Sequence, residues 1–231
     1  MGGLPEAEAR YRAARVAWET NRFDLERSST LAETCFDRAE FCSADKERSA
    51  LAEEGISASR EVVRRSSNNV AGHFFLAMNL GQLARTRVFT ALGLVSEMER
   101  HFLAAVALDP GFRDAGPERS LGMLYAQAPG WPTSIGSKSK ARQHLQRAVD
   151  LAPDFPENLL SLLEAEMGFG DRRRVATRIP ELDKTLARGR SLPALASRVE
   201  EWKEWESRAA ALRKYADTAP PASGRRKASG E

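Results

Sequence analysis

The sequence has little of what marks an exported or membrane-spanning protein. No stretch approaches 18 consecutive apolar residues, and residues 1–6 lack the basic start and apolar core of a secretory signal. Only two of the 231 residues are cysteines, Cys35 and Cys42. On one continuous helix they would lie about 10.5 Å apart, too far for a disulfide. We expect no transmembrane segment and no disulfide, and the sequence as given favours a cytoplasmic location.

Sequence motifs for catalysis or metal binding are also missing. There is no Gly-x-Ser-x-Gly, no Gly-x-x-x-x-Gly-Lys-Ser/Thr, no Cys-x-x-Cys and no His-x-x-x-His. Of the three histidines, His101 and His144 are 43 residues apart, which places them at matching positions of a repeat described below. We predict no catalytic residue, no cofactor and no metal site. An enzyme, the alternative, would need both histidines and a carboxylate to meet in one pocket.

Charge of one sign is not concentrated in the body of the chain. The formal net charge is +3, from 35 Lys and Arg against 32 Asp and Glu. Arg225, Arg226 and Lys227 against Glu231 contribute +2 of it, which leaves +1 for residues 1–219. A specific nucleic-acid binder would show a concentrated basic face. We therefore expect no specific nucleic-acid partner.

What the sequence does contain is a series of amphipathic helical patterns. Apolar residues recur at three- and four-residue spacing in segments rich in Ala, Arg, Glu and Leu, and no segment alternates with the period of a strand. The fold class is therefore predicted to be all-α. The expected helices are residues 11–22, 29–41, 45–66, 73–91, 95–107, 117–127, 138–151 and 156–168.

An internal repeat links these helices. Four residues recur at an offset of 43, so that Ala105, Val106, Pro110 and Phe112 match Ala148, Val149, Pro153 and Phe155. A fixed period of this length is typical of helical-repeat arrays, in which each helix pair buries its apolar face by stacking on its neighbour.

The residues of the repeat point to its type. Leu121-Gly122-x-x-Tyr125, followed by Ala141-x-x-x-Leu145-x-x-Ala148-x-x-x-x-Pro153, resembles the tetratricopeptide repeat (TPR), with extra residues between the two helices of the unit. Small residues at Gly122, Ala141 and Ala148 would allow neighbouring helices to approach closely. The resemblance implies a TPR-like solenoid of antiparallel helix pairs.

The inserted segment carries a second resemblance. Gly116-Pro117-x-Arg119-x-Leu121-Gly122-x-Leu124-Tyr125-x-x-Ala128-Pro129-x-Trp131-Pro132-x-x-x-Gly136, with Pro153-x-x-Pro156-x-Asn158 downstream, resembles the T-component family associated with TRAP transporters, over roughly residues 55–190. This resemblance implies a periplasmic lipoprotein that partners a solute-binding protein. No lipobox cysteine precedes the array, and Ser137 stands where that family would have an aspartate.

We predict one domain with short flanking segments. Residues 171–188 would form a helix pair broken near Pro180, and residues 193–217 a long amphipathic helix that caps the array. The predicted organisation is an N-terminal tail at 1–10, a solenoid domain at 11–217 with its capping helix at 193–217, and a disordered basic tail at 218–231.

Candidate binding residues are the polar side chains on the first helix of each unit, because these helices line the concave face of such an array. They would form either a structural hydrogen-bond network or a groove for a ligand. Trp131 would either anchor the inserted turn, in which case Trp131→Ala should cost about 3 kcal/mol, or form an aromatic wall of a cavity. The candidates are Asn79, Gln82, Arg85, Arg119, Tyr125, Trp131, Asn158 and Glu164.

Taken together, these patterns predict a non-catalytic binding or scaffold protein that uses a concave helical face. By the second resemblance it would be the accessory T component of TRAP-type solute transport, with a periplasmic solute-binding protein or an apolar small ligand as partner. The alternative is a cytoplasmic interaction scaffold unrelated to transport. Homo-oligomers through the terminal helices are compatible with either hypothesis.

Overall fold

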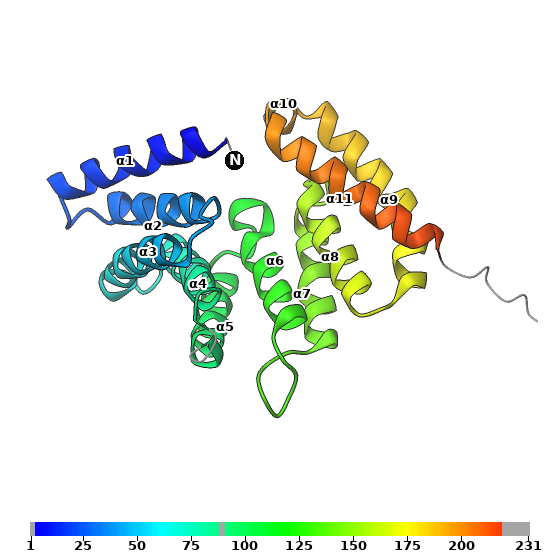
Figure 1. Ribbon diagram of the computed structural model, residues 1–231, viewed down its shortest axis with the longest axis horizontal. Coiled ribbons are helices and arrows are strands. Elements are labelled where there is room, and N and C mark those ends of the chain that lie inside the picture. The colour runs from blue at the N-terminus through cyan, green and yellow to red at the C-terminus, as the bar shows by residue number, and fades with distance from the viewer. Residues whose placement is uncertain (1–2, 88–90, 219–231) are drawn as a thin grey trace, which may run out of the picture.

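The computed structural model describes residues 3–87 and 91–218, and these form an array of α-helices without a β-strand. Consecutive helices pack side by side along an arc (Figure 1). The predicted all-α repeat fold is confirmed. The helices are α1 (Leu4–Thr20), α2 (Leu25–Ala39), α3 (Asp45–Arg65), α4 (Val70–Ala84), α5 (Ala91–Leu108), α6 (Phe112–Gln127), α7 (Lys138–Leu151), α8 (Pro156–Gly168), α9 (Arg172–Ser191), α10 (Pro193–Ala196) and α11 (Val199–Asp217).

Alternate helices form two layers. The backbone of α2 lies close to that of α4, and α6 lies close to α8, whereas no comparable approach joins α3 to α5 or α5 to α7 within the described ranges. Helices on the inner side of a curved array lie closer together than those on its outer side. Side chains join α4 to α6, with Phe74 against Phe112 and Ser120 Oγ 3.5 Å from Met78 Sδ, so we take α2, α4, α6 and α8 as the inner layer, the layer predicted to carry the binding residues.

The small residues of the repeat allow close packing between helices, as predicted. A Cβ atom added to Gly122 would lie 2.6 Å from Cγ of Leu145 and 3.0 Å from its backbone nitrogen. Ala141 and Ala148 of the next helix are fully buried. A larger residue at Gly122 would push α7 away from α6.

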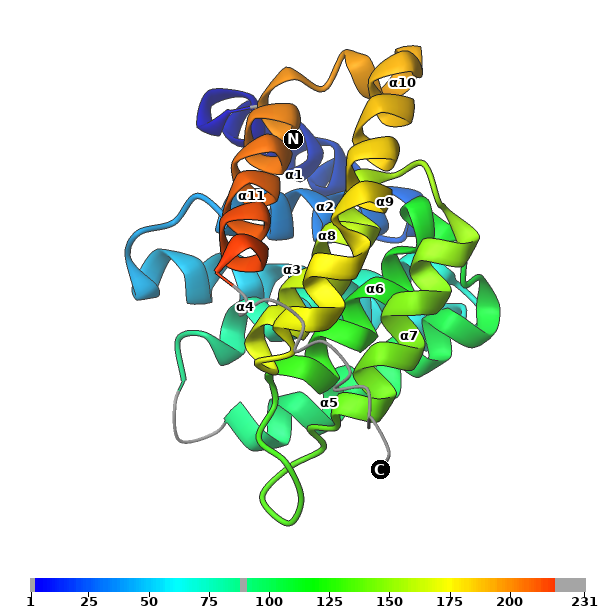
Figure 2. The same ribbon diagram turned by 90° about the vertical axis from the view of Figure 1, so that its right-hand side faces the viewer.

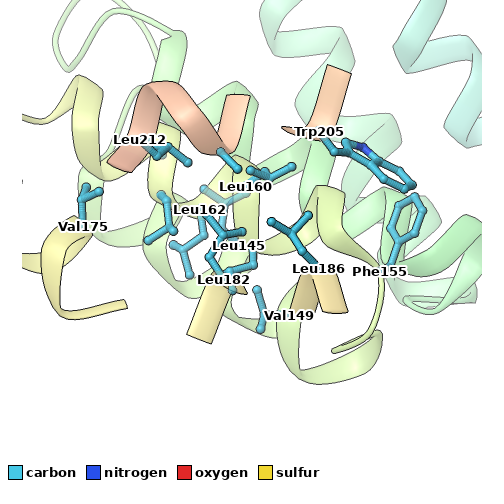
Figure 3. Packing of buried hydrophobic residues seen from close by; sticks show 14 of the residues in the cluster. Leu145, Val149, Phe155, Leu160, Leu162, Val175, Leu182, Leu186, Trp205 and Leu212 are labelled. Atoms are coloured by element: carbon cyan, nitrogen blue, oxygen red, sulfur yellow. The ribbon is translucent and has the colours of Figure 1, made fainter. Parts of the chain in front are cut away.

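The array contains two main hydrophobic clusters. The C-terminal cluster joins α7, α8, α9 and α11 through leucines and two tryptophans, Trp202 and Trp205, and Figure 3 shows its centre. The cluster of the N-terminal half is built on aromatic side chains of α4 and its neighbours, with Phe74 in edge contact with Phe75 and Phe112. The two clusters meet along α6 and α7.

Several predicted boundaries are wrong. Helix α1 begins at Leu4, so the residues expected as a tail are mostly helical; Pro5 is tolerated because the first turn needs no backbone donor there. Pro180 lies inside an unbroken α9, where it is exposed to solvent. The helix expected at 73–91 ends at Ala84. Most of the predicted basic tail lies outside the described residues.

The predicted C-terminal capping helix is in fact two helices. The helix is interrupted between Ala196, the end of α10, and Val199, the start of α11. The indole Nε1 of Trp202 donates a hydrogen bond of 2.7 Å to the carbonyl of Leu195 in α10. The same carbonyl also accepts from the backbone N–H of Arg198 at 3.0 Å, so the indole supplies a second donor to the end of α10. The buried Trp202 therefore contributes to the interruption between α10 and α11, which the apolar periodicity of the sequence did not predict.

Candidate binding face

The structure places six of the eight predicted binding residues within the inner layer of helices and a seventh, Arg85, directly after one of them. They lie on three helices of the arc shown in Figure 1. Asn79 and Gln82 belong to α4, with Arg85 directly after its last residue, Arg119 and Tyr125 belong to α6, and Asn158 and Glu164 belong to α8; Trp131 lies in the loop between α6 and α7.

Asn79 connects two helices of the inner layer. Its side chain is fully buried, and Nδ2 donates to the carbonyl of Ala32 in α2 at 2.9 Å and to that of Phe75 at 2.8 Å. Burial of an amide is costly unless its hydrogen bonds are made, and here both donors are satisfied by backbone. Asn79 therefore holds α2 against α4 and presents no atom to a partner.

Gln82 and Arg85 meet one carboxylate at the end of α4. Gln82 Nε2 donates to Glu40, and Arg85 Nη1 lies 3.3 Å from the same oxygen. The Gln82 side chain is buried, whereas Arg85 is half-exposed. Of this pair, only Arg85 is accessible to another molecule.

Arg119 and Asn158 form the tightest polar contact between α6 and α8. Arg119 Nη1 donates to Oδ1 of Asn158 at 2.6 Å and to the carbonyl of Asp114 at 3.0 Å. Asn158 Nδ2 donates to the carbonyls of Ala148 and Ala152 at the end of α7. The two predicted residues therefore act together and fix the position of the Arg119 guanidinium.

The carbonyl that Arg119 contacts belongs to a strained turn that the sequence did not reveal. Arg113, Asp114 and Ala115 have φ of 53°, 55° and 61°, a left-handed conformation that costs roughly 1–2 kcal/mol per non-glycine residue. The Arg113 side chain pairs with Glu33 of α2 at 2.6 Å. Gly116 and Pro117 directly after the turn are the signal in the sequence for an irregular start of α6.

The Arg119 guanidinium has no carboxylate within 4.0 Å among the described residues. It stacks over the ring of Phe155 at 5.3 Å, and Arg198 approaches the same ring at 5.6 Å. Desolvation lowers the pKa of Arg119, because a charged group loses hydration there. Its Nε and Nη2 groups meet no acceptor in the part of the chain that the structure describes, so a charged fork with free donors remains on the inner layer.

Glu164, by contrast, is fully engaged. Arg208 of α11 binds it with two parallel hydrogen bonds of 2.7 and 2.8 Å and also contacts Glu157 at 2.7 Å. Trp205 Nε1 donates to Glu157 at 2.9 Å. This network attaches α11 to α8, and Glu164 is therefore a joint between helices.

Tyr125 stacks on His144, with ring centroids 5.5 Å apart, whereas His101 lies in a separate contact. The Tyr125 hydroxyl donates to Glu99 at 2.6 Å, and burial together with Glu99 raises its pKa. His144 pairs with Glu118 at 2.6 Å, whereas Nδ1 of His101 lies 2.8 Å from Nδ1 of His73. The two histidines at matching repeat positions thus bind different partners.

Of the two alternatives expected for Trp131, the one in which it anchors the turn by packing on the solenoid is wrong. Its side chain is 88% exposed. The loop is instead closed by backbone hydrogen bonds, from Gly136 N to Pro129 O at 2.8 Å and from Ser137 N to Tyr125 O at 2.9 Å. Gly136 is required because an added Cβ would overlap the carbonyl of Ala128.

The described residues contain no group of three or more side chains placed to hold a metal ion. Within the same ranges, no helix is both long and apolar enough to cross a membrane. Cys35 and Cys42 are both buried and unpaired, and burial raises the pKa of each thiol.

Comparison with known proteins identifies the fold. No protein-family model and no curated protein sequence matches the chain. Among solved structures, it is similar to TTC0263, a thermophilic TPR protein in Thermus thermophilus, with 19% identity, a TM-score of 0.64, and coverage of 91% of this chain and 92% of that one. It is also similar to the MamA protein, with 15% identity, a TM-score of 0.53, and coverage of 78% and 83%. The fold is a TPR-like solenoid.

Proposed function

We propose that the chain binds an extended polypeptide segment along its inner layer of helices and that Arg119 receives a carboxylate of that segment. The observation that carries this proposal is the guanidinium of Arg119, which is partly buried, held by Asn158, and without a carboxylate in direct contact among the described residues; Glu157 and Asp114 attract it only from farther away. Buried charges in proteins are normally paired. A partner carboxylate would supply a directly bonded counter-charge and accept from the free Nε and Nη2 donors.

The hollow between α1 and α3 bears on the alternative of an apolar small ligand. A hollow of about 820 Å³ lies between α1 and α3, and it is open to solvent. Charged side chains such as Glu8, Arg12, Arg38 and Glu54 line much of it. Sites for apolar ligands are usually enclosed and lined mainly by apolar side chains. This hollow is therefore not shaped as an enclosed site for the apolar ligand considered from the sequence.

Binding of acidic peptides to single-arginine variants tests this function. The probes are fluorescent extended peptides rich in Asp and Glu, paired with peptides in which Asn and Gln replace those residues. We expect the acidic set to bind more tightly and Arg119→Gln to lower that affinity about tenfold or more, the cost of losing a bidentate charge pair. Arg213→Gln is the matched control, because Arg213 pairs with Asp183 between α9 and α11. Equal losses in both variants, or no preference for acidic peptides, would contradict the proposal.

The finer hypothesis is an accessory role in TRAP-type solute transport, supported by the Ala128-Pro129-x-Trp131-Pro132 turn and its resemblance to the T-component family. The partner would then be a solute-binding protein. Co-purification of the chain from its native host, followed by identification of bound proteins, separates this role from a scaffold unrelated to transport. Recovery of a solute-binding protein supports the accessory role, and its consistent absence among the captured partners argues for the scaffold.

A further inference from the structure

The loop between α6 and α7 projects from the body of the array. In both Figure 1 and Figure 2 it extends from the lower side of the arc as a closed loop. Trp131 lies within it with 88% of its surface exposed, and Pro129 and Pro132 beside it are exposed as well. An isolated, solvated tryptophan on a projecting loop requires an explanation, because tryptophan has a large apolar ring whose burial is strongly favourable.

The loop is held in one shape before any partner arrives. Thr133 N and Ser134 N donate to the carbonyl of Gly130 at 3.1 and 3.2 Å, and Gly136 N closes the base of the loop on Pro129. Presenting Trp131 therefore costs little additional conformational entropy on binding.

Charge along this part of the sequence is of one sign. No Asp or Glu occurs between Glu118 and Asp150, whereas that stretch contains Arg119, Lys138, Lys140, Arg142 and Arg147. The tip itself, residues 129–137, carries no charged side chain.

Two lysines follow the tip at the base of the loop, on the first turn of α7. Lys138 Nζ lies 3.5 Å from the carbonyl of Phe169, a neutral partner, so its charge remains available. Lys140 lies 3.7 Å from Glu99, and its side chain is about half exposed, so this pair is loose and open to exchange. Lys138 therefore offers the stronger attraction to an anion, and Lys140 the weaker one.

We propose that this loop is a docking site for an anionic lipid surface, with Trp131 entering the headgroup layer and Lys138 and Lys140 contacting lipid phosphates. Tryptophan prefers the membrane–water interface, where its ring is buried and its N–H remains hydrated. An uncharged tip can enter that layer without desolvating an ion, and lysines set back from it lie at the level of the phosphates.

A lipid surface fits this feature better than a second protein does. A stable protein interface buries about 800 Å² on each partner, which a narrow tip with one large side chain does not supply. Insertion into a headgroup layer needs no complementary surface, and each lysine adds to the attraction. This docking is independent of the inner-layer function proposed above, because it uses the loop after the C-terminal end of α6, whereas Arg119 lies within the helix.

Co-sedimentation of the full chain with vesicles tests the proposal, using phosphatidylcholine alone and phosphatidylcholine mixed with phosphatidylglycerol. We expect binding to the mixed vesicles that weakens with added salt. Trp131→Ala should lower that affinity about tenfold, and Lys138→Gln about fivefold. Phe23→Ala is the matched control, because Phe23 is 74% exposed in the loop between α1 and α2, where Asp24 follows it and the Arg65 over its ring is paired with Glu61, so that charges of both signs surround it.

Three results would overturn the proposal. The first is no binding to the mixed vesicles, or equal binding to both vesicle types. The second is an unchanged affinity of Trp131→Ala when circular dichroism shows that the variant is folded. The third is displacement of the vesicles from the loop by an acidic polypeptide such as polyglutamate, which would assign Trp131 to a protein contact.

Discussion

Helix α1 and helix α11 occupy corresponding places at the two ends of the array, yet different forces attach them. Helix α11 buries Trp202, Trp205, Leu212 and two alanines against α8 and α9. Helix α1 has the same order of length but buries only Ala7 and Ala14. It is held mainly by polar contacts, and its outward side is exposed. The C-terminal end is thus closed by fully buried aromatic rings in addition to the Arg208 network, whereas the N-terminal end has polar contacts and only two partly buried rings, Tyr11 and Trp18.

The polar attachment of α1 has an identifiable set of contacts. Arg10 pairs with Asp37 of α2 at 2.9 Å, and the Tyr11 hydroxyl donates to Glu54 of α3 at 2.6 Å. Such contacts are partly exposed and are screened by salt, so each contributes only about 1 kcal/mol or less. A terminal helix with this attachment opens locally at lower free energy than one with a buried aromatic pair.

The largest expected effect comes from the core of the C-terminal end. Trp202→Ala removes a fully buried ring that contacts Trp205 edge to face at 5.0 Å, and the variant should lose about 3–5 kcal/mol of unfolding free energy. Trp18→Ala on α1 is the matched change, since Trp18 is only partly buried, and it should cost about 1 kcal/mol. Urea denaturation of both variants measures the difference. Similar costs would show that the two ends are attached alike.

The N-terminal half should also be the pH-sensitive half, through two groups with opposite effects. Burial lowers the pKa of His101 from 6.5 to about 4, so the unfolded state binds a proton first and stability falls as pH drops from 6.5 toward 4. Burial raises the pKa of Asp37 from 3.8 to about 6, so stability rises as pH drops from 6 toward 3.8. Each effect is at most about 3 kcal/mol, and they largely cancel in the intact chain.

Single variants should separate the two opposing pH dependences of stability. Asp37→Asn removes the compensating effect, and its unfolding free energy should fall more steeply than that of the parent chain as pH drops from 6.5 to 4. The unfolding free energy of His101→Asn should instead rise as pH drops over the same window. Urea denaturation at several pH values provides the measurement. Parallel profiles for the two variants would mean that neither group titrates as its burial requires.

The sequence predicted what is local and periodic, and missed what depends on distant partners. Helix positions followed from apolar spacing, and the close approach at Gly122 followed from a small residue recurring in the repeat. The left-handed turn at Arg113 could not be foreseen, because non-glycine residues adopt it only when contacts such as Glu33 hold them there. In the same way, Arg119 and Asn158 are 39 residues apart in sequence, and no local pattern pairs them.

A smaller effect is expected at the polar end. Tyr11→Phe removes one hydrogen bond to Glu54 and should lower stability by about 1 kcal/mol. The destabilisation should be confined to α1. Backbone amides of α1 should exchange with deuterium faster in the variant, and more so at high salt, while those of α11 stay protected. Uniformly faster exchange across both helices would show that α1 does not open as a separate unit.

The smallest change in stability is expected for Trp131→Ala, because the ring is exposed instead of packed. The sequence predicts a cost of about 3 kcal/mol for Trp131→Ala if the ring anchors its loop, but the ring is 88% exposed and backbone hydrogen bonds close the loop. We expect a change within about 0.5 kcal/mol, typical of a surface position. Gly136→Ala is the sharper probe of the same loop, because a Cβ there would overlap the carbonyls of Ala128 and Pro129. A stable Gly136→Ala together with a destabilised Trp131→Ala would mean that the ring, and not the backbone, holds the loop in place.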